Sequence, residues 1–292
     1  SRARDESYLR NHVLPVFGRR PLSSISQLDV RQWVAELDAK GLKPATVHKA
    51  YQILGKIMSA AVDAEIISKS PCRKVQLPKV DAQEMRFLAP DEVWGLAEAI
   101  DPRYRAFVLL AAYSGLRRGE IFGLRPERLD LLRGRVEVAE ILVEVRGHQT
   151  FGPPKTRAGL RWVPLPRPVC DELGRHLAAY PGDLVFTSPQ GSPMRGSQFR
   201  ARYWLPAVKR AGLEPLRLHD LRHTAVALWI AAGASVKEIQ KRAGHASSST
   251  IIDRYGHVLP SAEEKVNQGL EELFWSGQNL PQEAPIFSIS KS

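Results

Sequence analysis

Cysteine is nearly absent from this chain, which holds only Cys72 and Cys170 among 292 residues. Two cysteines form neither a zinc-binding pattern nor a disulfide framework, which fits a protein of the reducing cytoplasm. No run of about 18 apolar residues occurs, which argues against a membrane span. The first residues also lack the apolar stretch of a secretory signal peptide.

Patterns for cofactor chemistry are missing as well. The chain has no glycine-rich loop of the P-loop type. It also has no cluster of carboxylates of the kind that holds two metal ions. We therefore expect neither a metal ion nor another cofactor.

Positive charge, in contrast, is abundant. Lys and Arg number 42 against 31 Asp and Glu, which gives a formal net charge of +11. Residues 1–80 hold 14 basic and 7 acidic side chains, whereas residues 261–292 hold 2 basic and 5 acidic ones. Such a surplus indicates a polyanionic partner, most commonly nucleic acid, although a merely basic enzyme has the same composition. The N-terminal quarter is the best candidate for gripping a phosphate backbone.

The length favours two domains, because 292 residues exceed what one core usually fills. Residues 1–78 are predicted to form a bundle of short helices, one of them capped by Ser26 and stopped by Gly41. Residues 79–87 are mostly polar and form a predicted linker. Residues 88–260 alternate helical patterns with short β-rich runs, and residues 261–292 form a tail. The predicted fold is mainly α, with a helical bundle followed by a mixed α+β domain that contains a small antiparallel sheet.

Four segments carry side chains suited to phosphate chemistry. They are Ser114–Glu120 (Ser-Gly-Leu-Arg-Arg-Gly-Glu), Pro154–Arg157 (Pro-Lys-Thr-Arg), His219–Thr224 (His-Asp-Leu-Arg-His-Thr), and Ala243–Ser247 (Ala-Gly-His-Ala-Ser) followed by Asp253–His257 (Asp-Arg-Tyr-Gly-His).

The clearest chemistry lies with His219 and Arg222. Side chains three residues apart share one face of a helix. A guanidinium group there binds two phosphate oxygens at once, and a neighbouring imidazole moves a proton. A solvated pair at the start of a helix has the same sequence, so this motif alone leaves both readings open.

The other candidates are weaker one by one. Arg117 follows a corner between two predicted helices, where a buried guanidinium presents its fork to a ligand and a surface arginine is equally at home. Lys155 lies between two β-rich runs, at a predicted hairpin tip from which it donates a proton to a leaving oxygen or simply faces solvent. His245 lies in a Gly-His turn, which lets an imidazole approach a ligand. Tyr255 ends a helical stretch, where a tyrosine is usually structural.

In their order and spacing, these segments resemble the active-site motifs of the tyrosine recombinase (phage integrase) family. The likeness covers nearly the whole chain, since residues 1–80 are similar to the family's core-binding helical domain. Ala243 departs from the leucine that more often precedes Gly-His in the family, which affects packing rather than chemistry. The N-terminal arm-binding domain of some integrases is missing, either because the protein lacks it or because the chain was cut.

The resemblance implies a site-specific recombinase that cleaves and rejoins DNA through a 3′-phosphotyrosyl intermediate, in the integration or excision of a phage or mobile element. It makes Arg117 and Arg222 the phosphate-clamping arginines and Lys155 the general acid. It makes His219 the general base or proton shuttle and His245 a second donor at the phosphate. It makes Tyr255 the nucleophile.

The partners implied by the resemblance are double-stranded DNA with a specific core site, a homotetramer on two duplexes, and accessory or directionality proteins in the cytoplasm of a bacterial host. The apolar patch around Leu270 and Trp275 in the tail packs either on a neighbouring subunit or within its own chain. The residues that we expect to contact DNA, each as consistent with a solvated face, are Lys43, Thr46, His48, Lys49, Lys56 and Arg157.

Three rival readings stay open. One is a DNA-binding regulator of the same fold that does no chemistry, in which these residues would be dispensable. A metal hydrolase uses His219 and His223, which have the four-residue spacing of zinc ligands, but no glutamate follows His219 and Arg222 repels a cation. A type IB topoisomerase shares the chemistry without exchanging DNA partners, and the compact helical N-terminal domain favours a recombinase.

Overall fold

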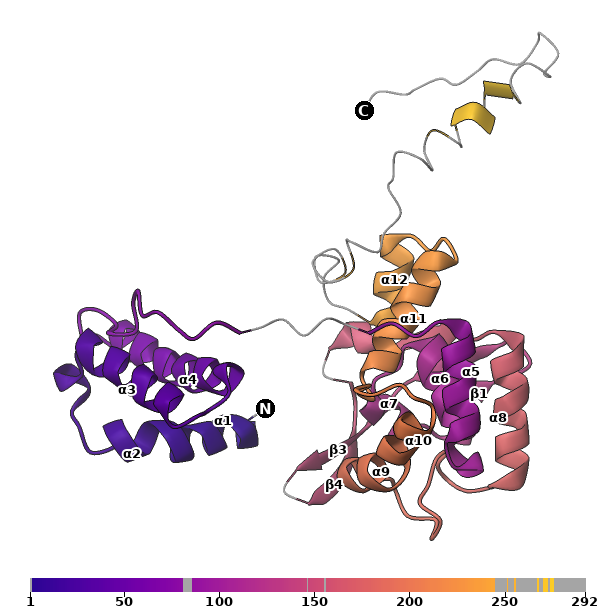
Figure 1. The fold of residues 1–292 in the computed structure, drawn as a ribbon, viewed down its shortest axis with the longest axis horizontal. Coiled ribbons are helices and arrows are strands. Elements are labelled where there is room, and N and C mark those ends of the chain that lie inside the picture. Colours follow the sequence, from indigo (N-terminus) through magenta and orange to yellow (C-terminus); the bar gives the residue numbers. More distant parts are fainter. Residues whose placement is uncertain are drawn as a thin grey trace. The chain divides into compact units, whose positions relative to one another are not determined.

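The computed structural model describes residues 2–80, 86–145, 147–154 and 156–244, together with residues 251, 255, 267, 270–272, 274 and 275. The chain divides into two compact units, Ser1–Glu84 and Met85–Ser292, which run from indigo to purple and from magenta to orange in Figure 1. Within the described part of the chain, no helix combines the length and the apolar character needed to cross a bilayer.

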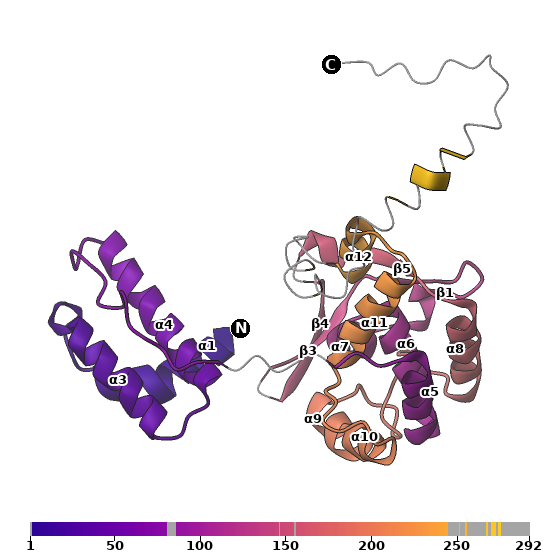
Figure 2. The same ribbon diagram turned by 45° about the horizontal axis from the view of Figure 1, so that its top comes forward.

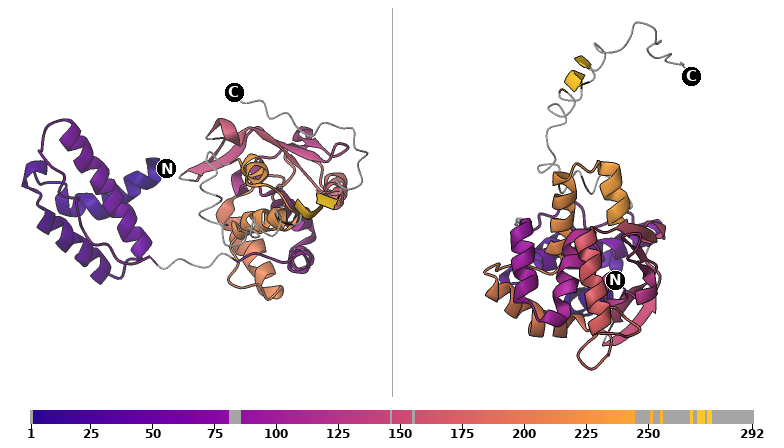
Figure 3. Two further views of the ribbon diagram at one scale, coloured as in Figure 1. Left: turned by 90° about the horizontal axis from the view of Figure 1, so that it is seen from above. Right: turned by 90° about the vertical axis from the view of Figure 1, so that its right-hand side faces the viewer.

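The first unit is a helical bundle, as predicted. Its middle helix, α3, starts at Ser26, whose hydroxyl accepts from the backbone N–H of Asp29 (3.2 Å), while the Asp29 carboxylate accepts from the backbone N–H of Ser26 (2.8 Å). This reciprocal cap satisfies two N–H groups that the first helical turn leaves unpaired. The core contains Trp33 and Met58, both almost fully buried, and the helices pack side by side in Figures 1 and 3. The elements are α1 (Arg2–Tyr8), η1 (Leu9–Val13), α2 (Leu14–Phe17), η2 (Leu22–Ser24), α3 (Gln27–Ala39) and α4 (Pro44–Asp63).

The first helix runs further than its sequence suggests. Pro15 marks an expected end, because proline cannot donate to the carbonyl one turn earlier. The structure instead continues the helix to Phe17, with the wider π-helical turn Leu9–Val13 immediately before Leu14 and Pro15. A π-turn shifts the hydrogen-bond pattern by one residue, and this shift lets the chain pass a proline without ending the helix.

The second unit is built around two buried helices, α6 and α11. Nearly every side chain of α6 is buried, from Ala106 to Ala112, and α11 packs directly against it. Figure 2 shows α11 passing beside α6 and α7, with α12 at its end. The helices are α5 (Pro90–Ala99), η3 (Pro102–Tyr104), α6 (Arg105–Ser114), α7 (Arg118–Phe122), η4 (Pro126–Arg128), η5 (Arg157–Gly159), α8 (Arg167–Ala179), α9 (Gly196–Phe199), η6 (Arg200–Trp204), α10 (Leu205–Arg210), α11 (Asp220–Ala231) and α12 (Val236–Ala243).

Small antiparallel sheets complete the second unit and confirm the predicted mixed α+β character. A three-stranded sheet has the order β1-β2-β5, and β3 pairs with β4 as a separate hairpin. The strands are β1 (Leu129–Asp130), β2 (Arg135–Val138), β3 (Ile141–Val145), β4 (His148–Gly152) and β5 (Arg161–Pro164).

The hairpin corrects one sequence-based expectation. Lys155 was predicted at the tip of a hairpin between the run at Ile141 and the run that became β5. However, β3 pairs with β4 in a register that joins Val145 to His148, so the hairpin turns there. The segment around Lys155 follows β4 and leads to β5, which pairs with β2 instead.

Candidate functional site

Arg117 lies where α7 begins, immediately after the corner that ends α6. Gly115 makes this corner with φ +61°, and a Cβ atom there would lie 2.8 Å from the Trp229 ring of α11. Glycine is therefore needed both for the left-handed backbone and for close packing. The Arg117 side chain is 42% exposed, which lies between the buried and the surface alternatives that the sequence left open. Its guanidinium donates to the Glu120 carboxylate (2.9 Å) and to the carbonyl of Gly244 (3.1 Å).

Glu120 is a buried carboxylate held between two arginines. Arg161 of β5 donates to both of its oxygens (3.2 and 3.0 Å), and the backbone N–H and the guanidinium of Arg117 donate to it as well (2.8 and 2.9 Å). Burial alone would raise the pKa of Glu120, but hydrogen bonds and charge from Arg161 and Arg117 outweigh it and lower the pKa below its ordinary value. Glu120 is thus an anionic centre that orients both guanidinium groups.

Arg222 is the most deeply buried of the arginines in this region. It lies in the first turn of α11 and is only 4% exposed. Its guanidinium donates to the carbonyl of Gly115 and to that of Ala243 (2.5 Å). The first helical turn of α11 therefore directs Arg222 across to the ends of α6 and α12.

The C-terminal end of α12 is the meeting point of the arginines. Arg222, Arg117 and Arg161 donate to the carbonyls of Ala243, Gly244 and Arg242, respectively. The last carbonyls of a helix have no partner within it and carry the negative end of its dipole, so they suit cations. Gly244 ends the helix with φ +61° and lies directly before residue 245.

The charges in this region favour the approach of an anion. Three guanidinium groups surround one carboxylate, that of Glu120. Burial, together with repulsion by Arg117 and Arg161, lowers the pKa of Arg222 to about 9, against attraction by Glu120 and Tyr255. A bound phosphate would restore the charge balance that Arg222 lacks in the isolated chain.

Tyr255 and two histidines lie beside this cationic cluster. The Tyr255 side chain is 1% exposed, and its phenolic oxygen lies 2.6 Å from Nδ1 of His223, the residue after Arg222. The His223 ring lies edge-on to that of His219, one helical turn earlier, at 4.9 Å between centroids. Within the described ranges, no three His, Cys, Asp or Glu side chains gather as a metal site would require.

The candidate residues fall into two groups. Arg117, Arg222, His219 and Tyr255 lie within the second unit, around the ends of α6, α11 and α12. Lys155 and His245 lie outside the described residues.

A cavity of about 380 Å³ opens next to Arg117 and Glu120, and Pro154 and Thr156 line it too. The two residues that flank Lys155 therefore border the same space as Arg117.

The residues expected to contact DNA in the first unit lie on or beside α4. Lys43 precedes its first residue and is exposed, and Lys56 is exposed further along. Lys49 and Lys56 each approach the Asp5 carboxylate only to 4.0 Å. His48 shares a 2.8 Å hydrogen bond with the carbonyl of Pro78, and Thr46 is half-buried. In the second unit, Arg157 is exposed.

Sequence reasoning missed three residues of this region. Glu120 and Arg161 form their buried pair across 41 positions of sequence. The available signal was the alternation of β5, which places Arg161 on the same buried face as Val163. His223 was considered only as a zinc ligand, although its place next to Arg222 on a buried helix was visible.

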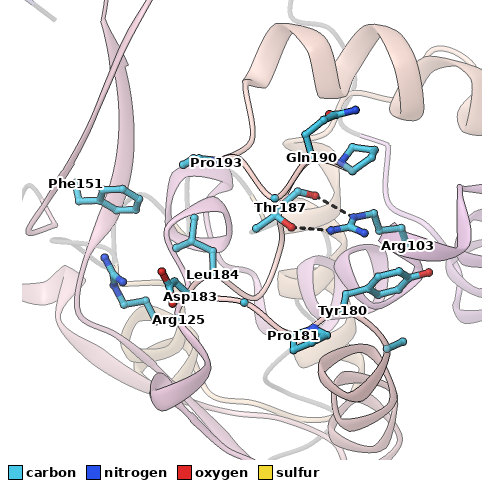
Figure 4. Close-up of a pocket in the computed structure, with 14 residues that line it drawn as sticks. Arg103, Arg125, Phe151, Tyr180, Pro181, Asp183, Leu184, Thr187, Gln190 and Pro193 are labelled. Atoms are coloured by element: carbon cyan, nitrogen blue, oxygen red, sulfur yellow. Dashed lines mark hydrogen bonds between the residues drawn. The ribbon is translucent and has the colours of Figure 1, made fainter.

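A larger cavity, of about 620 Å³, lies elsewhere in the second unit (Figure 4). None of the candidate residues lines it. Its arginines are engaged, because Arg103 donates to Thr187 and stacks on Tyr180, while Arg125 pairs with Glu140. This cavity does not enter the chemistry considered for the site.

Comparison with known proteins gives consistent matches. Residues 86–262 match the phage integrase family, and residues 1–37 match the phage integrase N-terminal SAM-like domain. The chain is 31% identical over 280 residues to the prophage phiRv2 integrase of Mycobacterium tuberculosis, which covers 94% of this chain and 74% of the relative.

Solved structures share the fold. The Tn1549 transposon integrase in complex with a circular intermediate DNA superposes with a TM-score of 0.79 at 21% identity, covering 93% of this chain and 92% of that one. A lambda integrase tetramer bound to a Holliday junction gives a TM-score of 0.62 at 18% identity, covering 85% and 70%.

Proposed function

The chain belongs to the phage integrase family and is a site-specific tyrosine recombinase, and from this premise we propose that Tyr255 is the residue that breaks and rejoins DNA. The observation that carries this assignment is the convergence of Arg117 and Arg222 on the adjoining carbonyls of Gly244 and Ala243. The phenol of Tyr255 shares a hydrogen bond with His223, the residue after Arg222.

The two arginines supply the charge that the reaction needs. Attack on a phosphodiester builds negative charge on the non-bridging oxygens of a five-coordinate phosphorus. Arg222 is buried and Arg117 is half-exposed, so the pair presents cationic donors from the core out to the surface. Burial, and then repulsion by Arg117 and Arg161, lowers the pKa of Arg222, so the negative charge of an incoming phosphate would stabilise its charged form.

The nucleophile must lose a proton before or during attack. A free tyrosine has a pKa of about 10, so forming its phenolate outright at pH 7 costs roughly 4 kcal/mol. Positioning and a nearby proton acceptor offset this cost. In the proposed scheme Lys155 protonates the departing 5′ oxygen, His219 assists proton movement, and His245 donates to the phosphate.

The resulting 3′-phosphotyrosyl link keeps the energy of the phosphodiester bond. Rejoining by a 5′ hydroxyl group therefore needs no ATP. The same link allows a strand to be joined to a new partner, which is the requirement for the integration or excision of a mobile element.

For the grip on DNA, we assign the core-binding role to residues 1–78, the linker to 79–87, and catalysis to 88–260. Lys49 and Lys56 support this role, since their 4.0 Å pairs with Asp5 are loose enough for phosphates to replace. The remaining contacts are assigned to Lys43, Thr46, His48 and Arg157.

The assembly that we propose is a homotetramer on two duplexes at a specific core site. The lambda integrase tetramer on a Holliday junction, which shares the fold, supports it. Tail residues 261–292 would join neighbouring subunits, accessory or directionality proteins would set the outcome, and the work would take place on DNA in the bacterial cytoplasm.

The test is a covalent trapping experiment on a nicked candidate core site. The unaltered protein should form a protein–DNA adduct that survives denaturing electrophoresis and maps to Tyr255. Tyr255→Phe should bind the same DNA and form no adduct, because the variant loses only the phenolic oxygen. An adduct formed by Tyr255→Phe at the normal rate would refute the assignment.

A further inference from the structure

The phenolic oxygen of Tyr255 is in contact with His223. Its Nδ1 atom lies 2.6 Å from that oxygen, well within the range of a strong hydrogen bond. Both groups are shielded from water, with exposures of 6% for His223 and 1% for Tyr255. A hydrogen bond in such a water-shielded site is electrostatically stronger than the same bond at the surface.

The contact links Tyr255 to the arginine cluster through His223. His223 directly follows Arg222, whose guanidinium donates to Ala243. The rings of His223 and Tyr255 lie 5.9 Å apart, tilted by 49°, so the bond is made at the ring edge and the ring faces do not stack. The nearby negative charge of an ionised Tyr255 would favour the charged form of Arg222, which puts the phenol within electrostatic range of the proposed clamp.

The direction of this hydrogen bond depends on the histidine tautomer, and the chemical types favour the phenol as the donor. A phenol is a better donor than a neutral imidazole N–H, and a neutral imidazole with its proton on Nε2 offers Nδ1 as an acceptor. We propose that His223 is a catalytic residue that accepts the phenolic proton of Tyr255 as the phenolic oxygen attacks phosphorus. This inference rests on the proposed role of Tyr255 as the nucleophile.

The step balances in both directions. During cleavage, the bond between the Tyr255 oxygen and phosphorus forms while the phenolic proton passes to Nδ1 of His223. The bond between phosphorus and the 5′ oxygen breaks, and that oxygen takes a proton from the general acid. During rejoining, the 5′ hydroxyl group attacks phosphorus and gives its proton back to the general acid. The bond between phosphorus and the Tyr255 oxygen breaks, and His223 returns its proton to the phenol.

This assignment changes the expected role of His219. The sequence resemblance gave His219 the role of general base or proton shuttle, whereas the phenolic oxygen lies 2.6 Å from Nδ1 of His223. His219 lies edge-on to His223 at 4.9 Å, so it acts next to the proton acceptor and keeps its proposed role in assisting proton movement.

One substitution separates proton acceptance from hydrogen bonding, and a second serves as its control. His223→Asn places an amide atom where Nδ1 stands, so it can bond to the phenol but cannot take its proton. We expect adduct formation to slow by about 10²-fold or more, within the range for general-base catalysis. His176→Asn is the matched control, because His176 is also buried and bonded, to the carbonyl of Val185, and should leave the rate within about 2-fold.

The decisive measurement replaces Tyr255 with a fluorinated tyrosine, whose phenol is more acidic. If His223 removes the proton, the acidic phenol should restore at least about 10-fold of the rate lost in His223→Asn, since Brønsted behaviour links rate to acidity. A slow His223→Asn variant without this rescue would show that His223 only positions the phenol, and a wild-type rate in that variant would also overturn the proposal.

A measurement on the unaltered chain keeps the proposal testable if the variant does not fold. The ¹⁵N chemical shifts of the His223 ring at neutral pH should show an unprotonated Nδ1, and a proton on Nδ1 would overturn the proposal. Tyr255→Phe distinguishes the two levels of inference. If that variant still forms the adduct, the proposed function is wrong. If Tyr255→Phe is inactive but His223→Asn is fully active, only the proposed role of His223 is wrong.

Discussion

Replacing Glu120 by glutamine should destabilise the second unit by about 3–5 kcal/mol. The carboxylate accepts four hydrogen bonds, two from Arg161 and two from Arg117, at 2.8–3.2 Å. In Glu120→Gln, one oxygen becomes an NH₂ group that faces donors, so half of these bonds are lost. Each hydrogen bond to a charged group is worth about 1.5–3 kcal/mol, and Arg161 keeps a buried charge with no compensating anion.

The assay is calorimetry, which resolves the unfolding of the two units as separate transitions if they unfold independently. For a domain of this size, about 3 kcal/mol lowers the midpoint of unfolding by roughly 6–12 °C. Glu98→Gln is the matched control, because Glu98 pairs with Arg105 at 2.9 Å but is half-exposed, and exposed pairs contribute less than about 1 kcal/mol. A loss below about 1 kcal/mol in Glu120→Gln would refute the view of Glu120 as the anionic centre of the site.

Three further predictions follow from the same region. Arg222→Lys should slow adduct formation by about 10²-fold while DNA affinity changes little, because lysine cannot make the two-pronged contact of a guanidinium; a wild-type rate in single-turnover cleavage would contradict the clamp. The folded state holds the pKa of Glu120 below its ordinary 4.5, so the stability that the ionised carboxylate contributes is present above about pH 4.5 and is lost as the pH falls. Acidification should therefore lower the free energy of unfolding of the unaltered chain more than that of Glu120→Gln. Parallel plots of stability against pH for the two proteins would count against this prediction. Gly244→Ala should lower stability by about 1–3 kcal/mol, measured by denaturant unfolding, because φ is +61° and the added Cβ would lie 2.9 Å from the carbonyl oxygen of Ala158. Gly147→Ala is the control, because Gly147 also has a positive φ but has open space around it. Equal losses of stability in both variants would show that the contact with Ala158 contributes nothing.

Local signals explain which parts of the fold were predictable. Ser26 and Gly41 bound α3 because capping and left-handed turns depend on residues close in sequence. The strand β4, His148–Gly152, was missed because it has little β-branched character and forms by pairing with β3. The helix continues from Pro15 to Phe17 after a π-turn, which local propensity does not indicate.

The candidate site follows the same division. Arg117, His219 and Arg222 stand in compact motifs whose residue types already indicate phosphate chemistry. The bond between Tyr255 and His223 and the pair between Glu120 and Arg161 connect residues 32 and 41 positions apart. Such contacts depend on how α11, α12 and β5 pack, which periodicity and spacing along one chain do not specify.

The arginines grip the end of α12 by its main chain, and this has a consequence for how the protein can vary. A carbonyl oxygen is the same whatever side chain its residue bears, so the contact of Arg222 with position 243 does not itself require alanine there. Position 244 is more constrained, since its backbone angle and its close neighbours strongly favour glycine. The side chain at position 243 can therefore differ among such enzymes, where packing allows, while the carbonyl ligands of the arginines stay the same.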